Sequence, residues 1–302
     1  MTFRNRFAAT FIVALLLLAP TIVKSQAQKK PPAKSAPTQK KPQVQTVSGT
    51  AIFAVSKLEN EVTLDPIVIF NKGLYINPLP DENEPFVKQV ASKYMRTGQK
   101  HRVIFGGAEA GTVTVKQRFE SEIGLTTTAA LQSSIKLSDE VKALAVSSET
   151  LGGKQNSRRA PTLEERTAMM NLMNATYKQK KVPATLLAKV KTNNITAIDL
   201  DGDGKTELIG SFEISDQNQN SQNLFLIAEL KNNQYQSGLT WFKRGGESDS
   251  EVRRLIDVLD IDGDSVAEVF ATTSYYESTD FTIYKKVKGV WRSVYQGGFF
   301  GV

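Results

Sequence analysis

The chain of 302 residues contains no cysteine and a single histidine, His101. Without cysteine there is no disulfide, no thiolate metal site and no cysteine nucleophile. A zinc centre is also disfavoured, because zinc prefers His and Cys ligands. A Ser-His-Asp arrangement would have to use His101, and no nucleophile-elbow sequence accompanies it. We interpret His101, between Lys100 and Arg102, as a surface residue at the start of a strand.

Acidic residues are absent from residues 1–47, which carry eight of the 38 Lys and Arg residues. The rest of the chain is therefore almost neutral, so the net charge of +7 and the pI near 9.3 come from the N-terminal part. A nucleic-acid-binding domain would concentrate basic residues within its folded region. The charge distribution therefore predicts no nucleic-acid partner.

The N-terminus has the pattern of a secretory signal peptide. Arg4 and Arg6 precede an apolar run at residues 7–19, and small residues follow at 25–27. The run is too short to span a bilayer comfortably. We expect residues 1–27 to be removed, which leaves no transmembrane segment, with an uncleaved anchor as the alternative. The absence of cysteine excludes a lipobox, so the predicted location is secreted or periplasmic.

The remaining chain divides by composition and periodicity. Residues 28–47 are rich in Pro, Lys and Gln and predict a disordered linker. Residues 48–135 predict an N-terminal β-rich domain with one short helix, for which Pro85 suits the first turn and Gly98 the end. The glycine-rich stretch at 106–111 lacks the G-K-[ST] ending of a phosphate loop. It is better interpreted as a hairpin turn.

Residues 136–190 predict a helical segment. One helix is expected over residues 136–149, with Ser138 as its cap. A stronger helix begins at Thr162, which forms a capping box with Glu165, and Pro183 opens a brief third helix.

Four acids gather in one short loop between two β-like segments. Asp199, Asp201, Asp203 and Glu207 stand at relative positions 1, 3, 5 and 9. Alternate acids in a tight turn converge, and this many hard oxygen ligands suit calcium, with the backbone carbonyl of Lys205 as a further ligand. An EF-hand is excluded, because Gly210 stands where its closing Glu would be and the flanking segments are β-like.

A second loop repeats the first at a distance of 61 residues, since residues 197–212 align with 258–273. It carries the acids Asp260, Asp262, Asp264 and Glu268. Ser265 replaces the glycine found at position 204, and a positive φ there would cost Ser roughly 1 kcal/mol. We therefore predict a second, weaker calcium site. Nearby Asp257 is interpreted as a surface acid, with a compensating charge for the second loop as the alternative.

These loops resemble the calcium loop of the FG-GAP and VCBS repeat families, and residues 199–209 match its pattern throughout. The resemblance implies that residues 191–302 form two β repeats, of a kind that often serves adhesion or ligand binding. Two units cannot close a propeller, which has about four to eight blades. We expect an α+β, mainly β fold whose C-terminal region is a partial propeller-like arrangement or a sandwich, completed by the N-terminal part or another chain.

The combined pattern predicts an exported, non-enzymatic calcium-binding protein. Calcium would stabilise the β repeats, which would mediate interaction or adhesion with an envelope polymer or a protein partner. The alternative is a secreted hydrolase of envelope polysaccharide or peptide in which calcium is structural. A pair of acids in a deep cleft away from both loops would favour that alternative. A third interpretation makes residues 48–135 the working surface of an inhibitor or accessory subunit.

Overall fold

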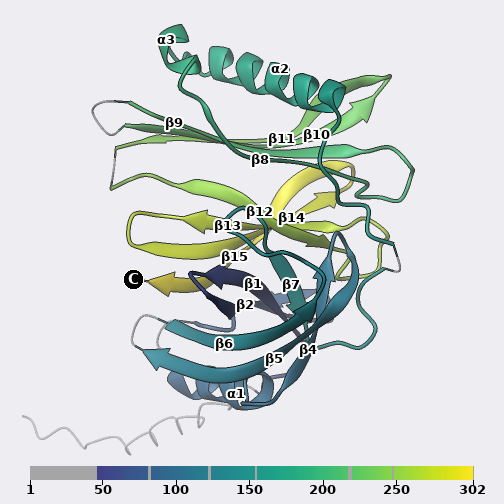
Figure 1. The fold of residues 1–302 in the computed structure, drawn as a ribbon, viewed down its shortest axis with the longest axis vertical. Helices are drawn as coiled ribbons and strands as arrows, with labels where there is room; N and C mark the ends of the chain where they lie inside the picture. The colour runs from purple at the N-terminus through teal and green to yellow at the C-terminus, as the bar shows by residue number, and fades with distance from the viewer. Residues whose placement is uncertain are drawn as a thin grey trace, which may run out of the picture. The chain divides into compact units, whose positions relative to one another are not determined.

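Antiparallel β-sheets dominate the computed structural model, which describes residues 46–80, 83–121, 124–153, 155–216, 220–246 and 248–301 (Figure 1). The compact unit spans Val44–Val302. The mainly β class predicted from the sequence is confirmed. The predicted signal peptide and most of the predicted linker lie outside the described residues. No helix in the described part of the chain is long and apolar enough to cross a membrane.

The N-terminal half forms a closed six-stranded barrel with one additional strand. The strand order is β1-β7-β4-β5-β6-β2-β3, and a further pairing of β1 with β2 closes the ring. Closure leaves six strands without a free edge. The strands are β1 (Thr50–Leu58), β2 (Glu61–Asn71), β3 (Leu74–Ile76), β4 (Lys100–Phe105), β5 (Ala108–Ser121), β6 (Gly124–Ser133) and β7 (Ala143–Val146).

Alternation along the strands divides the barrel residues between two cores. On β1, Phe53 and Val55 belong to the interior cluster, whereas Ile52 and Ala54 face the C-terminal sheets. Helix α1 (Glu84–Tyr94) contributes buried residues to the interior cluster. Its N-cap is Asn83, and a proline follows in the first turn, as the sequence predicted.

The prediction of a helix over residues 136–149 is wrong. The segment instead contains β7, which pairs with β1 and β4 and is needed to complete the ring. All four residues of β7 are buried. The local helical period is therefore overridden by pairing with strands that are distant in the sequence. The predicted helices at 162 and 183 are present as α2 (Leu163–Gln179), with its capping box, and α3 (Ala184–Leu187).

The C-terminal half consists of two four-stranded sheets that follow the sequence repeat. Sheet B contains β8 (Lys191–Ile198), β9 (Glu207–Ser215), β10 (Ser221–Lys231) and β11 (Gln234–Gly245). Sheet C contains β12 (Val252–Leu259), β13 (Glu268–Ser274), β14 (Ser278–Val287) and β15 (Val290–Gly301). In each sheet the acidic loop joins the first strand to the second.

The two sheets stack in the same orientation. The equivalent residues Ile209 and Phe270 show this, because Ile209 packs between the sheets whereas Phe270 packs against the barrel. Leu208 and Val269, also equivalent, pack under α2 and between the sheets respectively. Figure 1 shows the resulting layers, with α2 over sheet B, sheet C beneath it and the barrel beyond. The outer faces of the pair are thus covered by a helix and by the N-terminal barrel.

Candidate metal centre

Loop 1, residues 199–206, is shaped by the carboxylate of its first acid. One carboxylate oxygen of Asp199 accepts a hydrogen bond from the N–H of Gly202 at 2.8 Å, and the other accepts one from the N–H of Gly204 at 3.0 Å. Asp203 accepts the N–H of Lys205 at 2.7 Å. These short-range bonds replace the backbone ladder through the turn and direct successive acids toward one point.

Loop 2, residues 260–267, repeats this framework. Asp260 accepts the N–H groups of Gly263 at 2.8 Å and Ser265 at 2.9 Å, and Asp264 accepts that of Val266 at 3.0 Å. Ser265 has φ 69°, so the left-handed conformation on which its predicted cost depends is present. The glycine at the equivalent position 204 has φ 79°. The two loops therefore have the same backbone path despite the different residue.

Three acids of loop 1 converge. Asp199, Asp201 and Asp203 each offer an oxygen, and these oxygens lie within 4.8 Å of one another. The Oδ1 atom of Asp201 is buried and accepts no hydrogen bond from the described residues. Carboxylate oxygens are the ligands that calcium prefers in proteins. The geometry can therefore hold a divalent cation.

The fourth acid, Glu207, closes the loop from β9 without joining the three converging oxygens. Its side chain is buried, and its Oε2 accepts the N–H of Leu200 at 2.9 Å. It makes no ion pair with any residue that the structure describes. Burial raises the pKa of Glu207 to about 7, an effect that the Leu200 amide opposes and the nearby acids increase. A cation at this loop would stabilise the ionised carboxylate.

Two lysines lie beside loop 1. Lys205 pairs with Asp203 at 2.6 Å, but the two side chains are 57% and 41% exposed. Lys286 approaches Asp201 at 3.6 Å, while its closer partner is Glu229 of β10 at 2.8 Å. Neither ammonium group lies within hydrogen-bonding distance of more than one acid of the loop.

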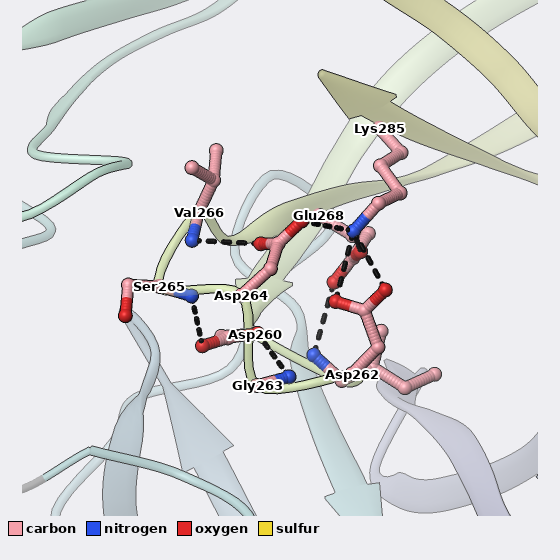
Figure 2. A network of polar contacts seen from close by, with 9 residues as sticks. Asp260, Asp262, Gly263, Asp264, Ser265, Val266, Glu268 and Lys285 are labelled. Atoms are coloured by element: carbon pink, nitrogen blue, oxygen red, sulfur yellow. Dashed lines mark hydrogen bonds and ion pairs between the residues drawn. The ribbon is translucent and has the colours of Figure 1, made fainter. Parts of the chain in front are cut away.

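Loop 2 differs because a lysine lies within its acid cluster. The Nζ of Lys285, on β14, lies 2.8 Å from Asp262, 2.6 Å from Asp264 and 2.8 Å from Glu268 (Figure 2). Burial lowers the pKa of Lys285, but hydrogen bonds to these three acids outweigh it and raise the pKa overall. Burial still raises the pKa of Glu268 to about 7 against the effect of Lys285. The oxygens of Asp260, Asp262 and Glu268 lie within 4.8 Å of one another.

Sequence reasoning missed Lys285, because only the strand register shows that it is equivalent to Glu229. Leu208 pairs with Ala228 on β10, and the equivalent Val269 pairs with Tyr284 on β14. The next residues, Glu229 and Lys285, therefore occupy equivalent positions beside the closing acids. The repeat thus carries opposite charges at one position.

Residues before α2 hold loop 1 in place. Ser157 donates to the carbonyl of Asp199 at 3.2 Å. Arg159 donates to both oxygens of Glu165 at 2.7 Å and to the hydroxyl of Thr206 at 3.2 Å. Arg159 therefore connects the capping residue Glu165 of α2 to the loop.

Two residues interpreted as exposed are buried. Asp257 is 0% exposed, accepts the N–H of Gly106 from the barrel and pairs with Arg158 at 3.2 Å. His101 is 3% exposed, with Nε2 2.8 Å from the carbonyl oxygen of Tyr94. Burial lowers the pKa of His101 although the Tyr94 carbonyl opposes this. Both surface interpretations are wrong, because each polar group has a buried partner that the local sequence does not reveal.

Comparisons with protein-family models, with curated proteins and with solved structures find no match to this chain. The resemblance to the FG-GAP and VCBS calcium loops therefore depends on the residues of the two loops.

Proposed function

We propose that this chain is an exported, non-enzymatic calcium-binding protein in which a calcium ion at loop 1 stabilises the stacked sheets. The observation that carries this proposal is the convergence of Asp199, Asp201 and Asp203 beside the buried Glu207, which forms no ion pair within the described part of the chain. Their negative charges repel one another, and burial makes that repulsion harder for water to screen. A divalent ion removes the repulsion.

Calcium suits the site better than magnesium. Calcium takes about six to eight oxygen ligands in flexible geometry, whereas magnesium requires a tight octahedron and retains several waters. Loop 1 offers three converging carboxylates with Glu207 beside them, and a buried oxygen of Asp201 has no hydrogen bond within the described residues. The carbonyl of Lys205 and water would complete the shell. The loop can thus supply many oxygens without a rigid cage.

Bound calcium would act on stability through linkage. An ion that binds only the folded state contributes about 2.7 kcal/mol at a hundredfold excess over Kd. Weak extracellular sites fill at about millimolar calcium. The ion would fix β8 to β9, the two strands that loop 1 joins. Sheets stabilised in this way would present a surface for an envelope polymer or a protein partner.

Differential scanning calorimetry of the mature chain tests the metal proposal. Calcium should raise the melting temperature, a chelator should lower it, and magnesium should act more weakly. The Asp201→Asn variant should lose the response, whereas the exposed Asp139→Asn variant should retain it. A wild-type melting temperature that responds to neither calcium nor chelator would overturn calcium binding.

A pull-down from the envelope fraction of the producing cell tests the proposed interaction. The immobilised mature chain is incubated with the fraction in calcium and in chelator, with Asp201→Asn as the matched bait. Calcium-dependent capture by the wild type alone is expected. Equal capture by both baits in both buffers would contradict a calcium-stabilised binding surface.

A further inference from the structure

Loop 2 contains an ammonium group that belongs to the chain. Lys285 contacts three carboxylates at 2.6–2.8 Å, and its side chain is only 15% exposed. The innermost partner, Glu268, is 0% exposed. Figure 2 shows the lysine reaching from β14 to the acids of the loop. A side chain held by three short ion pairs and largely excluded from water is a fixed part of the loop.

This ammonium group and a divalent ion would compete for the same oxygens. Calcium binds oxygens at about 2.3–2.6 Å, so an ion shared by Asp262 and Glu268 would lie against the Lys285 nitrogen. Two positive groups at that separation repel strongly where water is scarce. Calcium could enter only after the lysine had left its three partners.

The equivalent position of loop 1 has the opposite charge. Glu229 occupies it, and its carboxylate is already paired with Lys286 at 2.8 Å and Lys231 at 2.6 Å. No side chain of β10 therefore supplies a cation to Glu207. The two repeats share their loop geometry but differ in whether a lysine of the chain contacts the buried closing acid.

We infer that Lys285 is the built-in cation of loop 2, so that the chain binds one divalent ion at loop 1 and retains at loop 2 a latent metal site. The single ion at loop 1 rests on the proposed function, whereas the assignment of Lys285 does not. This inference replaces the sequence-based expectation of a second, weaker calcium site.

The location of loop 2 suggests why its cation is permanent. Glu268 lies two residues before Phe270, on the face that packs against the barrel. Tyr75 of β3 lies close enough that, besides burial, the charge of Glu268 raises the pKa of its hydroxyl. A covalently attached cation keeps this junction neutralised when calcium is absent, whereas loop 1 responds to the ion.

Isothermal titration with calcium alone measures the number of sites. Wild type and the exposed-lysine control Lys288→Met should bind one ion, and Lys285→Met should bind two. Adding Asp201→Asn to Lys285→Met should return the number to one. A Lys285→Met variant that gains no ion relative to wild type would overturn the latent site.

Lysine acetylation of the wild type followed by mass spectrometry gives an answer even if Lys285→Met does not fold. Lys285 should react much more slowly than Lys205, whose side chain is 57% exposed, and calcium should not change its rate. Calcium-induced exposure of Lys285 would show that the ion displaces it and would overturn the inference. Failure of the proposed function gives a different result. In that case the wild type binds no calcium, but Lys285→Met still binds one ion.

Discussion

Loops 1 and 2 have the same internal hydrogen bonds but differ in the charge of the residue that lies beside the closing acid. In both loops, the carboxylate of the first acid accepts hydrogen bonds from the backbone N–H groups at loop positions 4 and 6. The carboxylate of the acid at position 9 accepts a hydrogen bond from the backbone N–H at position 2. The difference lies on a neighbouring strand, where Glu229 in sheet B corresponds to Lys285 in sheet C. An acidic loop motif therefore does not by itself determine metal dependence. Under the proposed assignment, the residue beside the closing acid determines whether the loop needs a metal ion.

The largest expected effect comes from removing Lys285 in chelator. Lys285→Met leaves Glu268 buried and unpaired, and losing one partner of a buried pair costs about 3–5 kcal/mol. Lys205→Met in loop 1 should change the free energy of unfolding by less than about 1 kcal/mol, because that pair is exposed. Urea unfolding of both variants measures the contrast. Equal small losses would show that Lys285 does not neutralise a buried cluster.

Asparagine substitutions at the third position of each loop should separate their responses to calcium. At a hundredfold excess over Kd, calcium should stabilise the wild type by about 2.7 kcal/mol, or roughly 5–10 °C in melting temperature. Asp201→Asn should remove this shift, and Asp262→Asn should leave it. Calorimetric scans with and without calcium measure both. The reverse order would assign the ion to loop 2.

A third comparison concerns Asp257, whose equivalent in sheet B is Thr196. Burial raises the pKa of Asp257 to about 6, against the effect of Arg158, compared with an ordinary 3.8. The unfolded chain therefore releases this proton first, so the contribution of Asp257 to stability is greatest below pH 4 and falls as the pH rises to about 6. The loss is roughly 2–3 kcal/mol, at about 1.4 kcal/mol per pKa unit.

Asp257→Asn should flatten this part of the pH dependence of the unfolding free energy. At neutral pH the variant should also be less stable than wild type, because Arg158 is only 8% exposed and loses its anion. Urea titrations from pH 4 to pH 7 provide the measurement. An unchanged slope between pH 4 and pH 6 would exclude Asp257 as the titrating group.

The sequence predicted features that depend on neighbouring residues. The Thr162–Glu165 capping box, the turn at 106–107 and the repeated acidic loops are all local, and the structure contains each of them. Strand β7 was not predicted, because its short apolar run lies within a helix-like pattern and only pairing with β1 and β4 makes it a strand. Barrel closure is a non-local property that periodicity does not reveal.

The same distinction applies to the candidate site. The acids of loop 2 are close in sequence, whereas Lys285 lies 17 residues beyond Glu268 and reaches it through strand pairing. The partners of Asp257 are farther away still, and its bond to Gly106 spans 151 positions. His101 had a local signal that was misjudged, because strand alternation places its side chain opposite those of its charged neighbours. Ion pairs across the fold require the register as well as the motif.

The smallest predicted difference between the loops concerns the backbone at their sixth position. Ser265 has φ 69° and Gly204 has φ 79°, and this region costs a side-chain-bearing residue roughly 1 kcal/mol relative to glycine. An added Cβ at Gly204 would meet no atom within 4 Å, so a substitution there reports backbone strain without a clash. Ser265→Gly should therefore stabilise the chain by up to about 1 kcal/mol, and Gly204→Ser should destabilise it by a similar amount.

Urea unfolding in chelator measures the free energy of unfolding of both variants without any contribution from calcium. The double variant Ser265→Gly with Gly204→Ser should be about as stable as wild type, because the two loops contact different neighbours and their effects add. Neither substitution should change the number of calcium ions bound, since the charge that distinguishes the loops is on β10 and β14. If Ser265→Gly instead allowed a second ion to bind in the presence of Lys285, backbone strain rather than the lysine would be what closes loop 2 to metal.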